Sequence, residues 1–393
     1  MDFHLDTCAK ALWTSFFRSK GTPGRLCGRR WGFLLGTVLT FYPLMELWVR
    51  LGWLTDEVFF RGYRRQPIEG PIFIVGPHRS GTTLLQRVLD RDEALTTTYT
   101  WELFFAPSVS QRKLFRLLGR VDRGLGSPLR RFLEWLGPHL TQMPHAKEYF
   151  RRHPLSLFKP EEDGQFFTHL CAHSDLMCFF PFPELMLPYA RYDDEIPEQR
   201  RRRDMAFYRA MIQRHLYAHP GRRYLSKTPF LSGRVATLLE TFPDAKFIHL
   251  VRHPLEVIPS AMTLWRSHWV MNGCPEETYP LKEVIIEQTH YWYRHLHEVL
   301  SPLPPERYIR VDYRDLTQEL GATVERIYTQ FGLPISADFA VALAEEDAKA
   351  KRYRSSNRYT LEEMGLSVAQ LAEVFADVAP LYGFEFRPEL APH

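Results

Sequence analysis

The residues best suited to chemistry lie in a short loop bounded by Gly76 and Gly81. A run of four apolar residues, 72–75, precedes this loop, and leucines at helical spacing follow it. The pattern therefore predicts a strand, a tight loop and a helix. Such a loop points backbone N–H groups at a helix N-terminus, where the partial positive charge binds phosphate. We predict an anion site formed by His78, Arg79, Ser80, Gly81, Thr82 and Thr83.

The loop departs from the nucleoside-triphosphate pattern at one position. That pattern is G-x-x-x-x-G-K-[ST], in which the lysine reaches the β- and γ-phosphates. Here Thr83 fills the last position, but Thr82 stands where the lysine would be, and the cation lies inside the loop at Arg79. ATP hydrolysis is therefore disfavoured. A kinase or NTPase-like phosphotransferase stays open as an alternative, as does a glycine turn that binds nothing.

Two further cations follow predicted strands later in the chain. Lys227 ends the run 224–226, and Arg252 follows the apolar run 246–251, which is typical of a buried parallel strand. In open α/β sheets, ligands bind at the carboxyl ends of the strands. We therefore expect both cations to lie beside the glycine-bounded loop. Ser260 stands eight residues after Arg252, and both side-chain types bind phosphate.

Several acidic or imidazole groups are candidates for a general base. Glu102 lies in a β-branched and aromatic stretch, 96–107, which predicts a strand or extended loop. It is either a buried acid with the raised pKa of a general base or a glutamate at a helix start. Three adjacent acids, 161–163, either begin a helix after Pro160 or face a cleft. His169 and His173 match no zinc pattern, so no metal is predicted.

Composition limits the partners and the compartment. The net charge of the 393 residues is only +4, so a general nucleic-acid binder is not indicated. The five cysteines are odd in number, widely spaced and without a C-x-x-C motif, which suits a reducing compartment. We therefore expect a cytoplasmic protein, or one at the inner face of a membrane.

The N-terminal segment, 1–54, is basic and then apolar. Residues 31–45 carry no charge, but a spanning helix needs about 20 apolar residues. Basic flanks and Trp, Phe and Leu suit a helix at a membrane surface or beside a hydrophobic substrate. A packed core helix and a true span are the alternatives. The remainder, 55–393, is expected to be one α/β domain with a helical insertion at about 105–220.

These motifs together resemble the PAPS-dependent sulfotransferase family of bacterial type, which is related to the tyrosylprotein sulfotransferases. The resemblance rests on the R-S-G-T-T loop, a later glutamate, Lys227-Thr-Pro-Phe, the Arg252–Ser260 pair and the segment D-Y-R-D-L at 312–316. It implies a P-loop-like, three-layer α/β/α fold with a central parallel sheet. It also implies PAPS as the co-substrate, with no metal.

The resemblance further implies roles for individual residues. Glu102 becomes the favoured base, with His145 and the acids 161–163 in reserve, and Arg79 and Lys227 hold the charge that builds during sulfuryl transfer. Arg252 and Ser260 bind the 3′-phosphate. A late basic loop folds over the nucleotide, unless it is only an exposed tail, and its candidates are Ser355, Ser356, Asn357 and Arg358.

The acceptor is expected to be a small molecule with a hydroxyl group. Aromatic residues at 101–105 and 179–182 and the apolar segment 31–54 favour a lipid-like compound. A carbohydrate also fits, because aromatic walls stack on sugars. Peripheral membrane contact through 31–54 would accompany a lipid acceptor. A non-catalytic, membrane-associated nucleotide-binding protein on the same fold is a further alternative, and the sequence predicts no oligomeric state.

Overall fold

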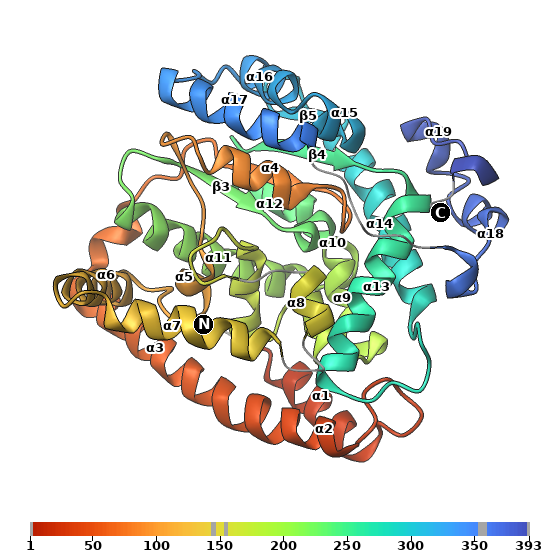
Figure 1. Cartoon of the computed structure of the whole chain (residues 1–393), viewed down its shortest axis with the longest axis horizontal. Coiled ribbons are helices and arrows are strands. Elements are labelled where there is room, and N and C mark those ends of the chain that lie inside the picture. The colour runs from red at the N-terminus through yellow and green to blue at the C-terminus, as the bar shows by residue number, and fades with distance from the viewer. Residues whose placement is uncertain (1–2, 143–146, 153–155, 353–359, 391–393) are drawn as a thin grey trace.

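The molecule is built on a central parallel sheet, shown in the computed structural model of Figure 1. The structure describes residues 3–142, 147–152, 156–352 and 360–390. The strands are arranged in the order β2-β3-β1-β4-β5, and every paired neighbour is parallel. Their bounds are β1 Ile72–Val75, β2 Leu95–Thr96, β3 Arg223–Lys227, β4 Lys246–Val251 and β5 Tyr308–Asp312.

The register brings the predicted site residues to one edge of this sheet. In β1, Ile74 pairs with Lys227 of β3, and Val75 pairs with His249 of β4. Because the strands are parallel, their carboxyl ends meet where the glycine-bounded loop leaves β1. Lys227 ends β3 and Arg252 follows β4, the two strands that flank β1, so both residues lie at this edge of the sheet, as expected.

Helices cover both faces of the sheet, as Figure 1 shows. Alternate side chains of β1 point to opposite faces, so Ile72 and Ile74 pack with α4, α16 and α17, whereas Phe73 and Val75 pack with α11 and α12. These helices are α4 Thr82–Leu89, α11 Glu198–Ala218, α12 Val235–Thr241, α16 Leu320–Phe331 and α17 Ala337–Arg352. The predicted three-layer α/β/α fold is confirmed.

The other helices surround this core, and those from α6 to α11 fall within the stretch expected to be a helical insertion. The remaining elements of the first two thirds are α1 Leu5–Phe17, η2 Arg61–Arg65, α5 Thr100–Phe104, α6 Val109–Gly124, α7 Pro128–Thr141, α8 Lys147–Arg152, η3 Asp163–Leu170, η4 Ser174–Cys178, α9 Pro183–Ala190, α10 Tyr192–Glu195 and η5 Pro229–Arg234. Later elements are α13 Pro254–Asn272, α14 Lys282–Leu300, α15 Tyr313–Gln318, η6 Glu362–Met364, α18 Val368–Val374, α19 Ala379–Tyr382 and η7 Pro388–Leu390.

One expectation about local structure is corrected. The stretch 96–107 contributes only the end of the two-residue strand β2 and then folds into α5, because Tyr99 and Glu102 form a capping box that starts a helix. Near the C-terminus, Ser367 caps α18, since its hydroxyl accepts the N–H of Gln370.

The N-terminal segment forms one long helix along the edge of the molecule. It consists of α2 Gly28–Gly32, the π-helix η1 Phe33–Phe41 and α3 Tyr42–Phe59. In the part of the chain that the structure describes, it is the one helix long and apolar enough to cross a membrane, and most of its apolar window is exposed. The helix runs unbroken across the expected boundary at residue 54.

Both ends of this helix are tied to the rest of the protein. Near its C-terminal end, the buried Asp56 pairs with Arg214 of α11 at 3.1 Å. At its start, Cys27 forms a disulfide with Cys274, which follows α13. The expectation that the cysteines are all reduced is wrong for this pair. Wide spacing in sequence concealed the pairing, since the fold brings the two residues together across 247 positions.

Candidate active site

The loop between β1 and α4 has the backbone that its glycines predict. Gly76 has a φ of 143°, and a Cβ there would meet the carbonyl oxygen of Leu250 at 2.3 Å. Gly81 has a φ of 90° and is the N-cap of α4. Only glycine adopts such conformations without strain. The hydroxyl of Ser80 donates to the carbonyl of Pro77 at 2.6 Å, which closes the loop against the helix N-terminus.

Arg79 connects this loop to the two other predicted phosphate ligands. Its own φ is 65°, and its Nε donates to Oγ of Ser260 at 3.0 Å. Nη1 of Arg252 donates to the carbonyl oxygen of Arg79 at 2.8 Å. Arg252 also pairs with Glu256 at 2.7 Å and lies over the ring of Tyr313. The structure thus brings Arg79, Arg252 and Ser260 together, although they are far apart in sequence.

Lys227 lies on the other side of the loop. It is almost fully buried, and its Nζ donates to Oγ1 of Thr83 at 3.2 Å and to Oε1 of Glu162 at 2.8 Å. Burial raises the pKa of Glu162, and the charge of Lys227 partly opposes that rise. A carboxylate, an ammonium group and the first turn of α4 therefore lie within one hydrogen-bonded set.

The predicted base Glu102 is not part of this set. It is buried at the third position of α5, where its Oε2 accepts the N–H of Tyr99 at 3.1 Å. Its Oε1 lies 3.3 Å from Nε of the buried Arg112, and burial raises its pKa. Glu102 thus stands at a helix start, as the alternative interpretation has it, and it is also a buried acid with a raised pKa.

Glu102 also belongs to the one group among the described residues whose geometry resembles a metal site. Its carboxylate and the rings of His215 and His219 offer ligand atoms within 4.8 Å of one another. Arg112, however, lies against the same carboxylate, and Arg116 donates toward His219. Two guanidinium groups at this position oppose the binding of a cation.

The three adjacent acids divide into two roles. Glu161 and Glu162 line a cavity beside the loop. Asp163 points into the core and accepts hydrogen bonds from four side chains, which are Tyr208, Tyr224, Ser226 and Thr228. It therefore fixes β3 and α11 around the site and does not face the cavity. His145, the other reserve, lies outside the described residues.

The cavity has a volume of about 1280 Å³ and connects the loop to an apolar wall. At one end it is lined by Arg79, Thr82 and Thr83, and at the other by Phe33, Val38 and Leu47 of the long N-terminal helix. Phe179 and Phe180 of the predicted aromatic wall line it as well, as does Phe104. The expectation that these aromatic segments border the substrate space agrees with their place in the structure.

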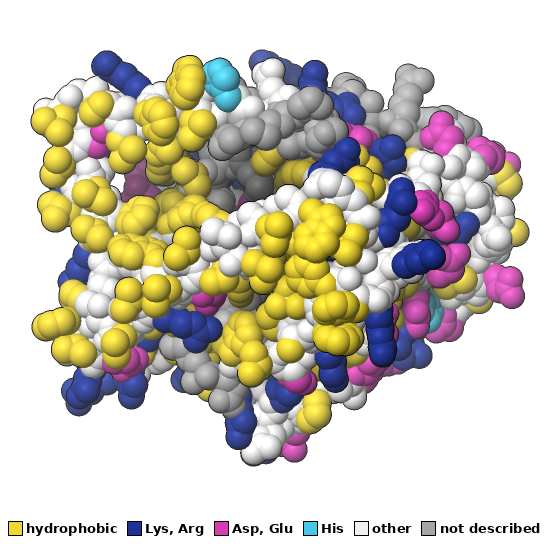
Figure 2. Space-filling model, turned by 90° about the horizontal axis from the view of Figure 1, so that it is seen from below, with side chains coloured by type: hydrophobic (Ala, Val, Ile, Leu, Met, Phe, Trp, Pro, Cys, Tyr) yellow, Lys and Arg dark blue, Asp and Glu magenta, His cyan; other side chains and the backbone are white. Residues whose placement is uncertain are grey.

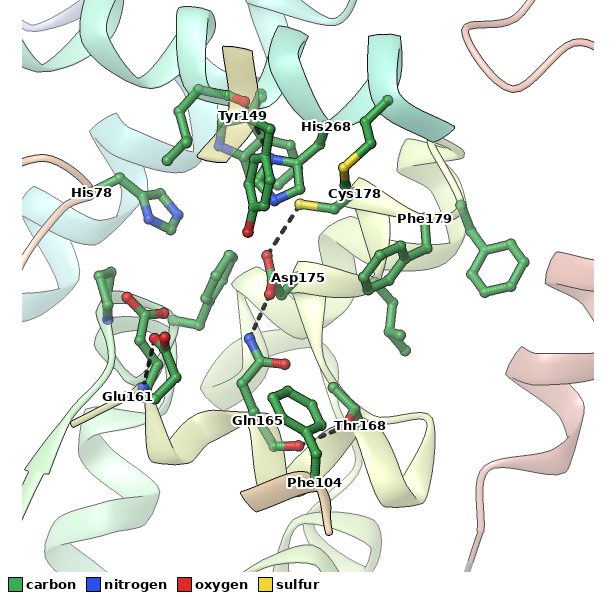
Figure 3. Close-up of a pocket in the computed structure, with 18 of the residues that line it drawn as sticks. His78, Phe104, Tyr149, Glu161, Gln165, Thr168, Asp175, Cys178, Phe179 and His268 are labelled. Carbon is green, nitrogen blue, oxygen red and sulfur yellow. Dashed lines mark hydrogen bonds between the residues drawn. The ribbon is translucent and has the colours of Figure 1, made fainter. Parts of the chain in front are cut away.

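Figure 3 shows polar residues in this cavity that the sequence did not single out. The carboxylate of Asp175 accepts Nε2 of Gln165 at 2.5 Å and the thiol of Cys178 at 3.2 Å. Tyr149 and His268 lie against each other, with ring centroids 4.3 Å apart. The sequence pattern of 168–178 directs attention to its histidines, which match no zinc pattern, and Asp175 carries no motif of its own.

The other predicted site residues are placed as follows. His78 is buried beside the ring of Phe230, and burial lowers its pKa to about 3, so its imidazole is neutral. His169 pairs with Glu46, and His173 caps η4 through the N–H of Asp175. Both fill packing roles, as expected. The late basic loop with Ser355, Ser356, Asn357 and Arg358 lies outside the described residues.

Comparison with known proteins assigns the class. A model of the sulfotransferase family matches residues 71–337, which include both glycines of the loop, Lys227, Arg252 and Ser260. The chain belongs to the sulfotransferase family and is a sulfotransferase, an enzyme that transfers a sulfuryl group.

Its relatives with assigned activities include the omega-hydroxy-beta-dihydromenaquinone-9 sulfotransferase Stf3 of Mycobacterium bovis and Mycobacterium tuberculosis. The identity is 27% over 371 residues, covering 91% of this chain and 85% of that protein. Crystal structures of two sulfotransferases share the fold. STF9 of Mycobacterium avium gives a TM-score of 0.69 at 19% identity and covers 98% of both chains. STF1 of Mycobacterium tuberculosis gives 0.67 at 19% identity, over 95% of this chain and 92% of that one.

Proposed function

We propose that this enzyme transfers the sulfuryl group of PAPS to the hydroxyl of a long, lipid-like alcohol. The observation that carries the proposal is the single cavity that joins the anion-binding loop to an apolar wall of the N-terminal helix. The donor requires binding groups for a 5′-phosphosulfate and for a separate 3′-phosphate. The acceptor requires a hydroxyl position beside a base and apolar space for the rest of the molecule.

The residues of the loop suit the donor. The loop amides and the N-terminus of α4 favour the phosphosulfate, since partial positive charge gathers there. Arg252 and Ser260 lie together across the loop and suit the 3′-phosphate, and Arg79 bridges the two groups. The imidazole of His78 is neutral, so its ring lines the cavity without adding charge. A donor with two separated phosphate groups thus matches the charge on this sheet edge.

Glu162 is the base that the geometry favours. Its carboxylate lies 2.8 Å from Nζ of Lys227, which in turn contacts Thr83 in the loop. In the proposed reaction the acceptor O–H bond breaks, the proton goes to Glu162, and the acceptor oxygen forms a bond to sulfur as the S–O bond to the bisphosphate breaks. Lys227 and Arg79 hold the charge on the sulfuryl oxygens and the leaving group. Electrostatic stabilisation of this kind often dominates such transfers.

The cavity wall and a relative both support a lipid-like acceptor. The wall contributed by η1 and α3 is rich in apolar residues, and Phe3 and the α1 residues Cys8 and Leu12 add to it. The mycobacterial Stf3 is named for its action on omega-hydroxy-beta-dihydromenaquinone-9. The disulfide between Cys27 and Cys274 removes the argument for a reducing cytoplasm, and we propose only that residues 31–54 contact a membrane peripherally.

Nucleotide binding tests the donor separately from the acceptor. Adenosine 3′,5′-bisphosphate should stabilise the protein, by about 2.7 kcal/mol at a concentration of 100 Kd, whereas ATP should not. Arg252→Ala should lose most of this shift, and Arg326→Ala, an exposed arginine on α16, should retain it. Equal stabilisation by ATP would favour the kinase or NTPase alternative instead.

Transfer itself is tested with the labelled donor. Heavy-sulfur PAPS incubated with the enzyme and a lipid extract of the source organism should label an organic-phase product detectable by mass spectrometry. Label confined to water-soluble sugars would overturn the lipid-like acceptor. Bisphosphate binding with no labelled product in any extract would favour the non-catalytic alternative.

A further inference from the structure

The helices α6 and α7 carry an exposed apolar surface that the catalytic site does not use. On α6 the apolar residues recur at helical spacing and share one face. Leu125 is 72% exposed, and Trp135 of α7 is 58% exposed. Other members of this surface are Leu117, Leu118, Val121 and Phe132. We call α6 and α7 together, residues 109–141, the insertion arm.

Basic residues alternate with the apolar ones along the arm. Lys113, Arg116, Arg120 and Arg123 recur every three or four residues on α6, beside the apolar face, and all are exposed. The two acids of the arm are already engaged. Asp122 accepts the N–H of Leu129, and Glu134 pairs with Arg130. The arm therefore presents an apolar stripe flanked by unbalanced positive charge, which is the pattern of a helix that lies in a membrane interface.

The arm is held against the apolar N-terminal helix. Nε2 of Gln111 donates to the carbonyl of Trp48 at 2.7 Å, and the hydroxyl of Ser110 donates to the carbonyl of Gly52 at 3.1 Å. Asp56 accepts the N–H of Ser110 and fixes the start of α6. The hydrogen bonds to Trp48, Gly52 and Asp56 orient the first turn of α6 on α3. The two helices thus form one unit.

This unit places two apolar surfaces on one side of the molecule. On α3 the exposed residues recur with one-face spacing, and they are Leu44, Leu47, Leu51 and Leu54. Figure 2 shows hydrophobic side chains gathered on both sides of a hollow on this face. Leu39, Phe41 and Leu47 both line the cavity and are exposed at the surface. The cavity therefore opens on the face that bears the apolar residues.

We propose that the insertion arm and α3 together form a surface that binds the headgroup region of an anionic lipid bilayer. The positive charge along α6 complements anionic headgroups, because basic residues near such a surface are attracted to it electrostatically. The apolar stripes insert below the headgroups. A second copy of this chain would place the same basic rows against each other, and their repulsion disfavours it as the occupant.

This placement also explains how a lipid would reach the base, a consequence that rests on the proposed function. A lipid alcohol could move sideways from the bilayer into the cavity, which η1 and α3 line, so its tail need not cross water. Membrane binding itself requires no catalysis, so it can be tested independently of any acceptor.

Vesicle flotation tests the surface. The full chain should float with vesicles of phosphatidylcholine containing about 30% phosphatidylglycerol, and much less with phosphatidylcholine alone. Leu117→Glu/Leu118→Glu should reduce the bound fraction at least tenfold, and Arg120→Gln/Arg123→Gln should abolish the preference for anionic vesicles. Val341→Glu is the matched control, because Val341 is 65% exposed on α17, which packs on the opposite side of the sheet from α11.

Each outcome decides the proposal. All variants should keep the thermal shift with adenosine 3′,5′-bisphosphate, which shows that they are folded and that the donor site is intact. The proposal is overturned by flotation of Leu117→Glu/Leu118→Glu equal to wild type, or by equal binding to neutral and anionic vesicles. It is also overturned if the wild type ignores vesicles and forms a dimer that this double variant dissociates. Loss of the bisphosphate shift in the wild type would instead count against the proposed function.

Discussion

Nε of Arg79 and Oγ of Ser260 lie 3.0 Å apart, although 181 residues separate them in sequence. The hydrogen bond joins the loop after β1 to α13, which follows β4. Arg252, at the end of β4, closes the set through the carbonyl of Arg79. Arg79 itself has a positive φ of 65°. The proposed donor site is therefore built from three segments.

Arg79→Ala should reduce transfer by at least 100-fold, since a well-placed donor typically contributes a factor of about 100 to 1000 to the rate. Calorimetric titration should also show weaker binding of the bisphosphate, because Ser260 and the loop lose their connection. Arg326→Ala is the control for loss of an exposed arginine. Wild-type rates in Arg79→Ala would exclude a catalytic role for that side chain.

Lys227 requires a paired design, because it is buried beside Glu162. Lys227→Met alone leaves an uncompensated buried carboxyl and should raise the pKa of Glu162 further, since the lysine now opposes its rise. The double variant Lys227→Met/Glu162→Gln removes both charges and should recover stability without recovering activity. A double variant that transfers sulfate at the wild-type rate would refute the role proposed for both residues.

The choice of base is tested by three amide substitutions. Glu162→Gln should reduce kcat by roughly 100- to 10,000-fold, the range for loss of a general base. In the wild type, kcat/KM should fall as pH drops through an apparent pKa above the usual glutamate range, because the raised pKa of Glu162 requires higher pH for the ionised form. Glu161→Gln should have a smaller effect on kcat and keep this pH profile.

Glu102→Gln should change the stability of the protein and leave the pH dependence of its activity as it is, in contrast to Glu162→Gln. It should lower stability by roughly 3–5 kcal/mol, because the buried Arg112 loses its partner. The pH profile of the remaining activity should stay unchanged, since Glu102 does not line the cavity. Urea unfolding and pH–rate measurements on Glu102→Gln and Glu162→Gln separate a structural role of Glu102 from a catalytic role of Glu162. A lost pH dependence in Glu102→Gln alone would restore it as the base.

Stability should fall as the solution is acidified below the ordinary histidine range. Burial lowers the pKa of His78, His173 and His249 to about 3. Below pH 6.5 the unfolded chain binds protons that the folded protein refuses, so each such histidine adds up to about 1.4 kcal/mol of instability per pH unit down to about pH 3. His249 is remote from the cavity, so His249→Phe should remove its contribution alone. Urea titrations between pH 6 and pH 4 should then show the free energy of unfolding falling less steeply with pH, by up to about 1.4 kcal/mol per pH unit. An unchanged slope would show that His249 is not buried neutral.

The sequence predicted the strands and the loop because each carries its own local signal. Gly76 and Gly81 mark positions where a side chain would collide, and the apolar run 246–251 marks a buried strand. Arg252 and Lys227 could be placed because parallel strands end at one edge of the sheet. These features depend on neighbours in sequence or on topology alone.

The sequence could not place the residues whose roles depend on tertiary contacts. Glu102 reads equally well as a base or as a helix start, and only its burial against Arg112 decides. Glu161 and Asp163 are two positions apart, yet one lines the cavity and the other is held by the core. Tyr149 and His268 come from segments that the fold alone brings together. The fold alone likewise brings Cys27 and Cys274 close enough to form a disulfide.

Alkylation tests that disulfide. Without a reductant, only Cys8, Cys171 and Cys178 should be labelled in the denatured protein, and all five cysteines should be labelled after reduction. Reduction should lower the free energy of unfolding by about 2–4 kcal/mol. Cys27→Ser/Cys274→Ser should show the lower stability without a reductant. Five labelled cysteines in the untreated protein would contradict the pairing.

The same covalent bond makes the two ends of the molecule inseparable by proteolysis. Cys27 lies just before the helix that forms the apolar cavity wall, and Cys274 follows the helix that carries Ser260. A cut anywhere between residues 28 and 273 would leave two fragments linked as one species on a non-reducing gel. After a nick in the insertion arm, the fragment that carries the N-terminal helix and the loop of Arg79 would stay covalently joined to the fragment that carries Arg252 and Ser260, until a reductant broke the bond.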